Sequence, residues 1–268
     1  MEELVVLGTG NGSALNCYNT CFALKNGEEY FVVDGGGGNK ILNNLRDLKI
    51  ELSSIHHIFI SHNHIDHILG VMWLVRLIGL LIARNGRYNG NLNIYASNET
   101  MTAISTMVKL LAPNDVKKVW GKQILLHTVS DREELDILGC KTIFVDIQAQ
   151  KEKQFGFKLE ISAGKWLAFL GDEPYNEKSF EIIKDSDWLL HEAFCLETEA
   201  ELFKPYEKGR CTVKEASLVA EKLKVKNLIL WHTMDNNLLN RRQVYTNEAS
   251  LYFTGNTIVP DDLDIIKL

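Results

Sequence analysis

The stretch Ser61-His62-Asn63-His64-Ile65-Asp66-His67-Ile68-Leu69-Gly70 holds three imidazoles and a carboxylate within six residues. His62 and His64 alternate by two, so an extended backbone can direct both rings at one point. Asp66 and His67 can open the following helix and face a second point nearby. Imidazole and carboxylate groups suit Zn, Mn or Fe. The stretch therefore predicts a metal site rather than a polar loop that happens to be rich in histidine.

Composition places the chain among ordinary globular proteins. It has 268 residues, 46% of them hydrophobic, which is enough to bury a full core. With 4 Pro and 19 Gly it is neither collagen-like nor of low complexity. A net charge of -6 gives no support to a general nucleic-acid binder, although a local basic pocket stays open.

The sequence also bears on the cellular compartment and on membrane insertion. The start, Met1-Glu2-Glu3, is acidic where a targeting segment is basic. Five Cys without an export signal indicate reduced thiols and a cytoplasmic location. The longest apolar run, 68–83, is interrupted by Arg76 and falls short of the ~20 residues that span a bilayer, so we expect a buried helix and no membrane partner.

Apolar periodicity predicts two successions of strands with helices between some of them. No Pro- or Ser-rich linker divides them, which favours one domain over 1–268 with two central sheets and outer helices. Turn signals at Asn26-Gly27 and Ala163-Gly164 predict two hairpins. The expected strands are 4–7, 21–24, 30–33, 55–60, 92–96, 124–129, 141–147, 155–161, 166–170, 187–190 and 227–231, and the expected helices are 39–49, 68–84, 99–111, 179–184 and 212–223.

The histidine stretch, with an apolar strand before it and Gly70 after it, resembles the metallo-β-lactamase superfamily. Three further segments match that family in the same order, namely 32–36 (VVDGG), 169–172 (FLGD) and 228–232 (LILWH). The resemblance covers nearly the whole chain. It implies an α/β fold, a four-layer αββα sandwich with a metal site at one end.

The resemblance also implies roles for single residues. Asp34 supports the metal loop without binding the ion, Asp172 bridges two ions, and His232 binds the second ion. One or two Zn ions are expected, with Mn or Fe as alternatives. The implied metal ligands are His62, His64, Asp66, His67, Asp172 and His232.

Within the superfamily the chain is most similar to the ribonuclease Z branch. The segment 191–194 (HEAF) resembles that branch's His-Glu-Ala-Thr loop, and 209–212 (GRCT) stands where it has Gly-His-Ser-Thr. The resemblance implies catalytic roles for Asp66, His191, Glu192 and Arg210.

Three positions depart from that branch. Gln148 stands where the family supplies another metal-binding His, or Gln150 if the register slips, so we expect a weak ligand or a supporting residue there. Arg210 replaces a His and cannot exchange a proton; it can grip a phosphate or form a salt bridge with Glu192. Only residues 158–170 separate Phe157 from Gly171, so the long tRNA-binding arm is missing.

These residues favour a metal-dependent hydrolase, with a phosphodiester in a small or single-stranded substrate as the main hypothesis. Extended tRNA binding is not expected. One alternative is a lactone or thioester hydrolase that uses the apolar helix to line an acyl pocket. Another is a ligand-binding member that has lost catalysis through Gln148 and Arg210. A homodimer is implied by the resemblance alone.

Overall fold

The computed structural model describes residues 1–268, apart from the side chain of residue 85. The chain divides into two compact units. Unit 1 comprises Met1–Gly8, Tyr18–Val129 and Leu263–Leu268, and unit 2 comprises Thr9–Cys17 and Ser130–Asp262.

Unit 1 is built on a seven-stranded mixed sheet in the order β14-β1-β2-β3-β4-β5-β6. The strands from β14 to β3 pair antiparallel and those from β3 to β6 pair parallel. Since parallel strands end at one edge of a sheet, the segments that follow β3 and β4 emerge side by side. The strands are β1 (Glu3–Gly8), β2 (Cys21–Asn26), β3 (Glu29–Val33), β4 (Ile55–Ile60), β5 (Leu92–Ala96), β6 (Ile124–Thr128) and β14 (Ile265–Lys267).

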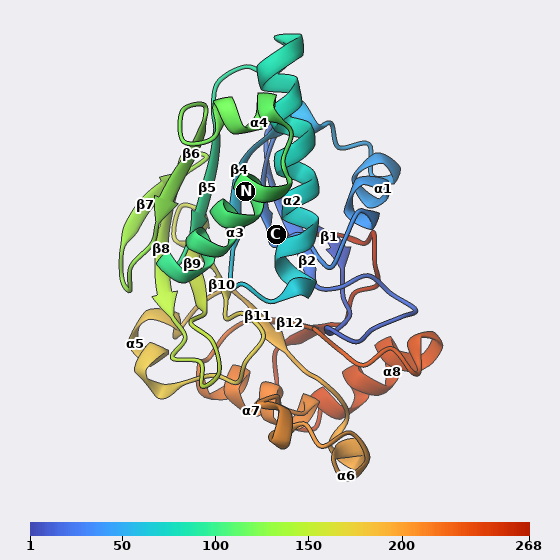
Figure 1. Ribbon diagram of the computed structural model, residues 1–268. Coiled ribbons are helices and arrows are strands. Elements are labelled where there is room, and N and C mark those ends of the chain that lie inside the picture. Colours follow the sequence, from blue (N-terminus) through green and yellow to red (C-terminus); the bar gives the residue numbers. More distant parts are fainter. The chain divides into compact units, whose positions relative to one another are not determined.

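Helices pack on this sheet, and Figure 1 shows the long helix α2 lying across it. Val71, Leu74, Val75 and Ile78 of α2 are fully buried in the core of unit 1. The helices are α1 (Lys40–Asp47), α2 (Ile65–Leu80, continued by a π-helical turn Leu81–Asn85), α3 (Asn98–Leu111) and α4 (Asn114–Val119).

Unit 2 repeats the same pairing pattern in a second seven-stranded sheet, in the order β13-β12-β11-β10-β9-β8-β7. Pairing is antiparallel from β7 to β10 and parallel from β10 to β13. The loops after β10, β11 and β12 therefore leave at one edge. The strands are β7 (Glu134–Ile137), β8 (Cys140–Asp146), β9 (Phe155–Ser162), β10 (Lys165–Phe169), β11 (Trp188–Glu192), β12 (Asn227–Trp231) and β13 (Asn256–Ile258).

Unit 2 has a core of its own, in which Ala216 and Ala220 of α7 pack with Tyr245 and Ala249 of α8. Thr212 caps α7 by accepting a hydrogen bond from the backbone N of Glu215, in a capping box. The helices are α5 (Phe180–Ile183), α6 (Ala200–Phe203), α7 (Val213–Lys222) and α8 (Leu238–Ala249).

Every strand and helix expected from the sequence is present, within a few residues of its predicted bounds. The hairpin turn in unit 1 falls on Gly27-Glu28, one residue later than expected, and Gly27 has φ +58°. The elements β7, β13, β14, α4, α6 and α8 were not predicted. Most of these are too short for a visible period. In α8 the buried stripe includes Arg241, which hides the apolar pattern.

One stretch among the described residues, Ile65–Arg84, is long and apolar enough to cross a membrane, with a mean hydropathy of 1.9 and half of it buried. It is longer than the apolar run 68–83, because the helix begins earlier. A core helix of a soluble protein passes the same test, so this is weak evidence for a membrane span.

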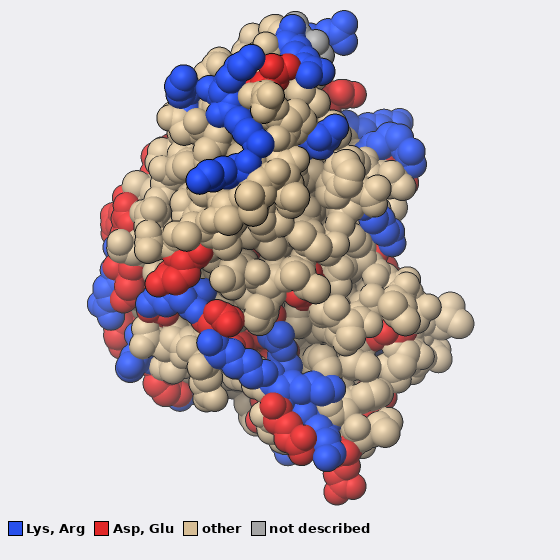
Figure 2. Space-filling model, viewed as in Figure 1, with Lys and Arg blue, Asp and Glu red and all other residues tan. Residues whose placement is uncertain are grey.

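The net charge of -6 conceals a basic region in unit 1. Residues 67–129 contain seven Lys or Arg and two Asp or Glu. Figure 2 shows basic side chains gathered over α4 and the end of α2. The acidic residues that give the chain its negative net charge therefore lie mostly outside residues 67–129.

We predict that Gly70→Ala destabilises the protein. An Ala in a helix usually adds stability, by up to about 1 kcal/mol relative to Gly. Here a Cβ on Gly70 would lie 1.7 Å from the backbone O of Gly35, which cannot yield without moving the loop after β3. Overpacking of this kind costs about 1–3 kcal/mol or more.

Urea unfolding checks this prediction. The matched control is Gly38→Ala, since a Cβ on Gly38 meets nothing within 4 Å. Equal stability of the two variants would contradict the close-contact argument.

Candidate metal centre

Asp34 organises the histidine loop of unit 1. It follows β3 in a left-handed conformation, with φ 59°. Its Oδ1 accepts a hydrogen bond from the backbone N of Ser61 (2.8 Å), and its Oδ2 accepts one from Ser61 Oγ (2.7 Å). His67 Nδ1 donates to the same Oδ2 at 2.9 Å. Asp34 therefore has the geometry of a supporting carboxylate, which is the role predicted for it.

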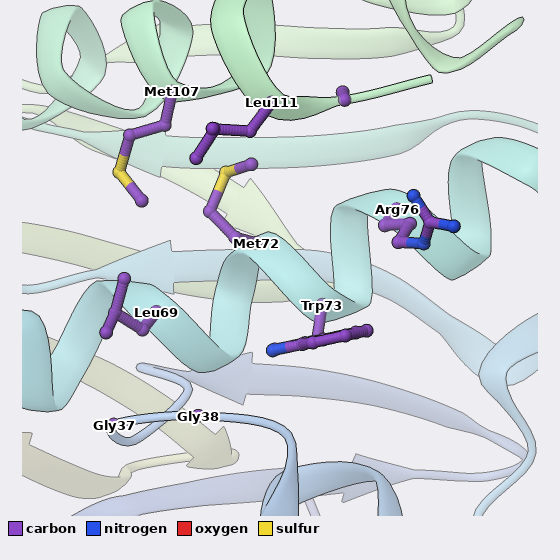
Figure 3. A pocket seen from close by; sticks show the side chains of 9 residues that line it. Gly37, Gly38, Leu69, Met72, Trp73, Arg76, Met107 and Leu111 are labelled. Atoms are coloured by element: carbon purple, nitrogen blue, oxygen red, sulfur yellow. The ribbon is translucent and has the colours of Figure 1, made fainter.

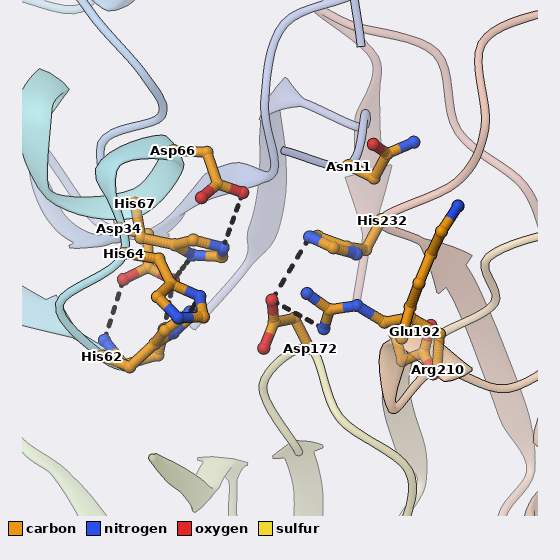
Figure 4. A network of polar contacts seen from close by, with 12 residues as sticks. Asn11, Asp34, His62, His64, Asp66, His67, Asp172, Glu192, Arg210 and His232 are labelled. Atoms are coloured by element: carbon orange, nitrogen blue, oxygen red, sulfur yellow. Dashed lines mark hydrogen bonds and ion pairs between the residues drawn. The ribbon is translucent and has the colours of Figure 1, made fainter. Parts of the chain in front are cut away.

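The imidazoles of unit 1 lie close together at the start of α2 (Figure 4). His62 Nε2 is 2.8 Å from His64 Nδ1, and the rings of His62 and His67 have centroids 4.1 Å apart. His67 Nε2 is 3.4 Å from Asp66 Oδ2. The bond from His67 Nδ1 to Asp34 sets the tautomer of the ring, so that Nε2 carries the lone pair.

In unit 2, Asp172 and His232 lie together at the carboxyl ends of β10 and β12. Both are 1% exposed, and His232 Nε2 is 3.4 Å from Asp172 Oδ2. Gly171 before Asp172 has φ +69° and His232 has φ +55°, so both loops turn sharply where their strands end. Arg210 adds an ion pair, with its NH1 2.8 Å from Asp172 Oδ2.

Glu192 and His191 end β11 and are fully buried. Glu192 Oε1 accepts a hydrogen bond from the backbone N of Cys211 at 2.5 Å, which anchors the loop that carries Arg210. Burial raises the pKa of Glu192 to about 8, and the nearby positive charge of Arg210 offsets part of that rise. His191 Nδ1 donates to the Glu192 carbonyl at 2.7 Å, and burial lowers the pKa of this imidazole.

Gln148 lies in the loop after β8, with φ 57°. Its amide Oε1 accepts a hydrogen bond from Lys178 Nζ at 3.0 Å. The backbone N of Gln150 bonds Glu173 Oε2 at 2.8 Å. The amide oxygen of Gln148 is thus engaged by a lysine, and its part in metal binding stays a prediction.

Several supporting residues were missed by sequence reasoning. Tyr18 Oη donates to the carbonyls of Gly35 and Gly38, which fixes the glycine-rich loop after β3. In unit 2, the predicted glycine turn 8–12 holds the residue after His232, since the backbone N and side chain of Asn11 both donate to the Thr233 carbonyl. The sequence shows the glycine-rich turn, but it does not show that the turn contacts Thr233.

An apolar pocket of about 380 Å³ also lies in unit 1, between α2 and α3. Figure 3 shows Met72, Met107 and Leu111 directed toward one another, with Trp73 and Arg76 along α2. This is where the lactone or thioester alternative would place an acyl chain.

A family model described as the Beta-lactamase superfamily domain matches residues 31–233. The chain belongs to this superfamily. It is 25% identical to a ribonuclease Z of Thermococcus sibiricus over 313 residues, which cover 100% of this chain and 97% of the relative. It is 28% identical to a ribonuclease Z of Enterococcus faecalis over 322 residues, covering 99% and 97%. The chain is a metal-dependent hydrolase of the superfamily.

Solved structures confirm the predicted metallo-β-lactamase fold. The YhfI protein of Bacillus subtilis has a TM-score of 0.77 and 16% identity, covering 100% of this chain and 99% of its own. A diphosphatase of the PhnP family has a TM-score of 0.75 and 18% identity, covering 100% of this chain and 98% of its own. Zn²⁺-bound PqqB of Methylobacterium extorquens has a TM-score of 0.75 and 14% identity, covering 99% of this chain and 100% of its own.

The donor groups of each unit fit a divalent cation. Zinc and similar ions take neutral imidazole nitrogens and carboxylate oxygens. Unit 1 offers His67, held by a supporting carboxylate, and unit 2 offers His232 next to Asp172. A histidine oriented by a carboxylate is the arrangement that metal-binding proteins use to raise the basicity of the ligand.

We predict that Asp34→Asn weakens metal binding about 10- to 100-fold, because Ser61 and His67 lose the carboxylate that orients them. Isothermal titration with Zn²⁺ or Mn²⁺ measures the change. The control is Asp187→Asn; Asp187 bonds the backbone N of Trp166 and the side chain of Lys226 just before β11 begins. Unchanged affinity in Asp34→Asn would show that the loop does not need this support.

A second prediction concerns pH. Because Glu192 has a pKa of about 8 in the folded protein against 4.5 ordinarily, the folded state keeps a proton that the unfolded state loses. Its contribution to stability is therefore present below pH 4.5 and is lost as pH rises toward about 8. We expect Glu192→Gln to gain stability relative to the natural chain over this window, by up to about 1.4 kcal/mol per pH unit.

Urea unfolding of the metal-free proteins at several pH values measures this difference. The exposed Glu207 provides the control variant, Glu207→Gln. Stability curves of Glu192→Gln and the natural chain that stay parallel from pH 5 to 8 would contradict the prediction.

Proposed function

We propose that this protein hydrolyses a phosphodiester bond in a small or single-stranded substrate at a divalent metal centre. The observation that carries the proposal is the support of His67 by Asp34, which fixes the tautomer of the ring and directs its Nε2 to the side of Asp66. Two of the relatives named above are ribonucleases Z, and RNA is linked by phosphodiester bonds, which supports this substrate class.

The ligands we propose are the six residues that the resemblance implies. His62, His64, Asp66 and His67 belong to unit 1, and Asp172 and His232 belong to unit 2. Zinc is the proposed ion, with Mn or Fe as alternatives, because the donors are nitrogen and oxygen atoms without thiolate. A bound ion would supply a water of lowered pKa and positive charge for the phosphoryl oxygens.

The protein's own groups set the conditions for that chemistry. Asp34 and Ser61 hold the histidine loop in place, so the imidazoles need no reordering when substrate binds. Asp66, at the start of α2, is proposed to act both as a ligand and as a catalytic carboxylate. His62 and His67 are buried, and imidazole nitrogens are donors that a divalent ion accepts.

In unit 2, Glu192 acts as a positioning residue. Through the backbone N of Cys211 it holds the loop of Arg210, whose guanidinium stays protonated and cannot serve as a general acid. His191 donates through Nδ1, and its buried Nε2 has no hydrogen-bond partner among the described residues. We propose that Nε2 accepts the proton that the attacking water loses and then donates it to the leaving oxygen of the substrate.

The substrate is proposed to be small because unit 2 has no arm. The strands β9 and β10 are joined by a tight turn at Ala163-Gly164. The alignment with the Thermococcus sibiricus ribonuclease Z is 313 residues long against 268 in this chain, so the relative carries segments that this chain lacks. Extended tRNA binding is not part of the proposal.

A cytoplasmic location completes the proposal. It is supported by the five cysteines, which the structure keeps as thiols. The homodimer stays a prediction of the resemblance. The comparisons give no support to a lactone or thioester substrate, nor to a member without catalysis.

We predict that a chelator abolishes hydrolysis of bis-nitrophenyl phosphate and that Zn²⁺ or Mn²⁺ restores it. Asp172→Asn should lower kcat about 100-fold or more, because it removes a charged ligand. Asp136→Asn, at the β7–β8 turn, is the control, since Asp136 only accepts a bond from the backbone N of Gly139. A homoserine-lactone substrate run in parallel tests the alternative. Activity that survives chelation, or faster lactone than phosphodiester hydrolysis, would overturn the proposal.

A further inference from the structure

Asp172 is in contact with a positive charge that belongs to the protein itself. Arg210 NH1 lies 2.8 Å from Asp172 Oδ2, and His232 Nε2 lies 3.4 Å from the same oxygen. Figure 4 shows both contacts converging on the carboxylate. The side chain of Arg210 is 15% exposed and that of Asp172 is 1% exposed, so the pair is shielded from solvent.

This contact competes with a metal ion. The resemblance makes Asp172 the bridge between two ions and His232 a ligand of the second. Any cation that binds Asp172 Oδ2 must share that oxygen with a guanidinium or displace it. Like charges repel strongly when they are buried, because the surrounding dielectric constant is low.

The backbone of Arg210 is anchored at several points. Its own N donates to the Pro205 carbonyl at 2.9 Å, and the next residue, Cys211, is bonded through N to Glu192 Oε1. Thr212 then caps α7. The side chain therefore starts from an anchored backbone, and from there its guanidinium reaches Asp172.

The charge at Asp172 itself points the same way. Asp172 carries one negative charge, and Arg210 already places one positive charge beside it. Two divalent ions at the same carboxylate would raise the positive charge beside it to five, whereas one ion would raise it to three. Buried charges are tolerated when they are paired, so the arrangement with one ion is the better matched.

Gln148 provides an independent observation. The resemblance implies an imidazole at this position, or at Gln150 if the register slips, for one of the two ions. Here the position carries a neutral amide whose oxygen is bonded to Lys178 Nζ at 3.0 Å. The chain therefore has one imidazole fewer for two ions, and one protein cation more.

We propose that Arg210 takes the place of one of the two ions implied by the resemblance, so that each chain binds a single divalent cation. This inference rests on the proposed metal centre and refines it. The ligand class is a divalent ion bound by imidazole and carboxylate, with the guanidinium supplying the other positive charge at Asp172.

Metal stoichiometry tests this inference without measuring activity. The full chain is dialysed to equilibrium against excess Zn²⁺ or Mn²⁺, and bound metal is counted by mass spectrometry. We expect one ion in the natural chain and in Arg210→Lys, which keeps the charge, and two ions in Arg210→Ala. Arg242→Ala is the matched control, because Arg242 pairs with Asp261 at an exposed position of α8.

The outcomes separate this inference from the proposed function. Two ions in the natural chain, or one in a folded Arg210→Ala, would overturn the role of Arg210 and leave the metal centre in place. No bound ion in the natural chain would overturn the metal centre, and the inference with it. Circular dichroism confirms folding, and the count for the natural chain stands even if Arg210→Ala does not fold.

Discussion

The buried carboxylate of Asp34 is the group on which the histidine loop of unit 1 depends. A carboxylate removed from water must have its oxygens hydrogen-bonded, because the cost of an unpaired buried charge is large. Ser61 and His67 meet that requirement, and this ties the ends of β3 and β4 to the start of α2. Two backbone features accompany this link between loop and helix. Asp34 has a left-handed conformation, and Gly35 of the loop lies in close contact with Gly70 of α2.

The polar cluster of unit 2 depends on a similar principle in another sheet. Parallel strands release their loops at one edge, and the ends of β10, β11 and β12 supply Asp172, Glu192 and His232. Three of the groups there are ionisable and buried, so each must find a partner. Glu192 uses a backbone N–H and Asp172 uses Arg210, which is how a loop residue far along the chain enters the site.

Much of the fold could be predicted from sequence because strands and helices that bury one face leave a regular apolar pattern. The pattern fails where a polar residue faces the core, as in α8. There Arg241 is 2% exposed and donates to the Thr233 side chain and the Pro260 carbonyl. It also fails for three-residue edge strands such as β13 and β14, which are too short to show alternation.

The amino-acid sequence by itself determined the histidine-rich stretch at 62–67, the order of the motifs and hence the superfamily, because the residue types of a motif and their spacing are local and can be read along the chain. Only the tertiary structure decided which partner each charged group takes. Arg210 could have paired with Glu192 or stayed available for a phosphate, and the fold gives it to Asp172. The pairing depends on where the loop of Arg210 lies relative to the ends of β10 and β11, and this position cannot be inferred from the order of residues alone.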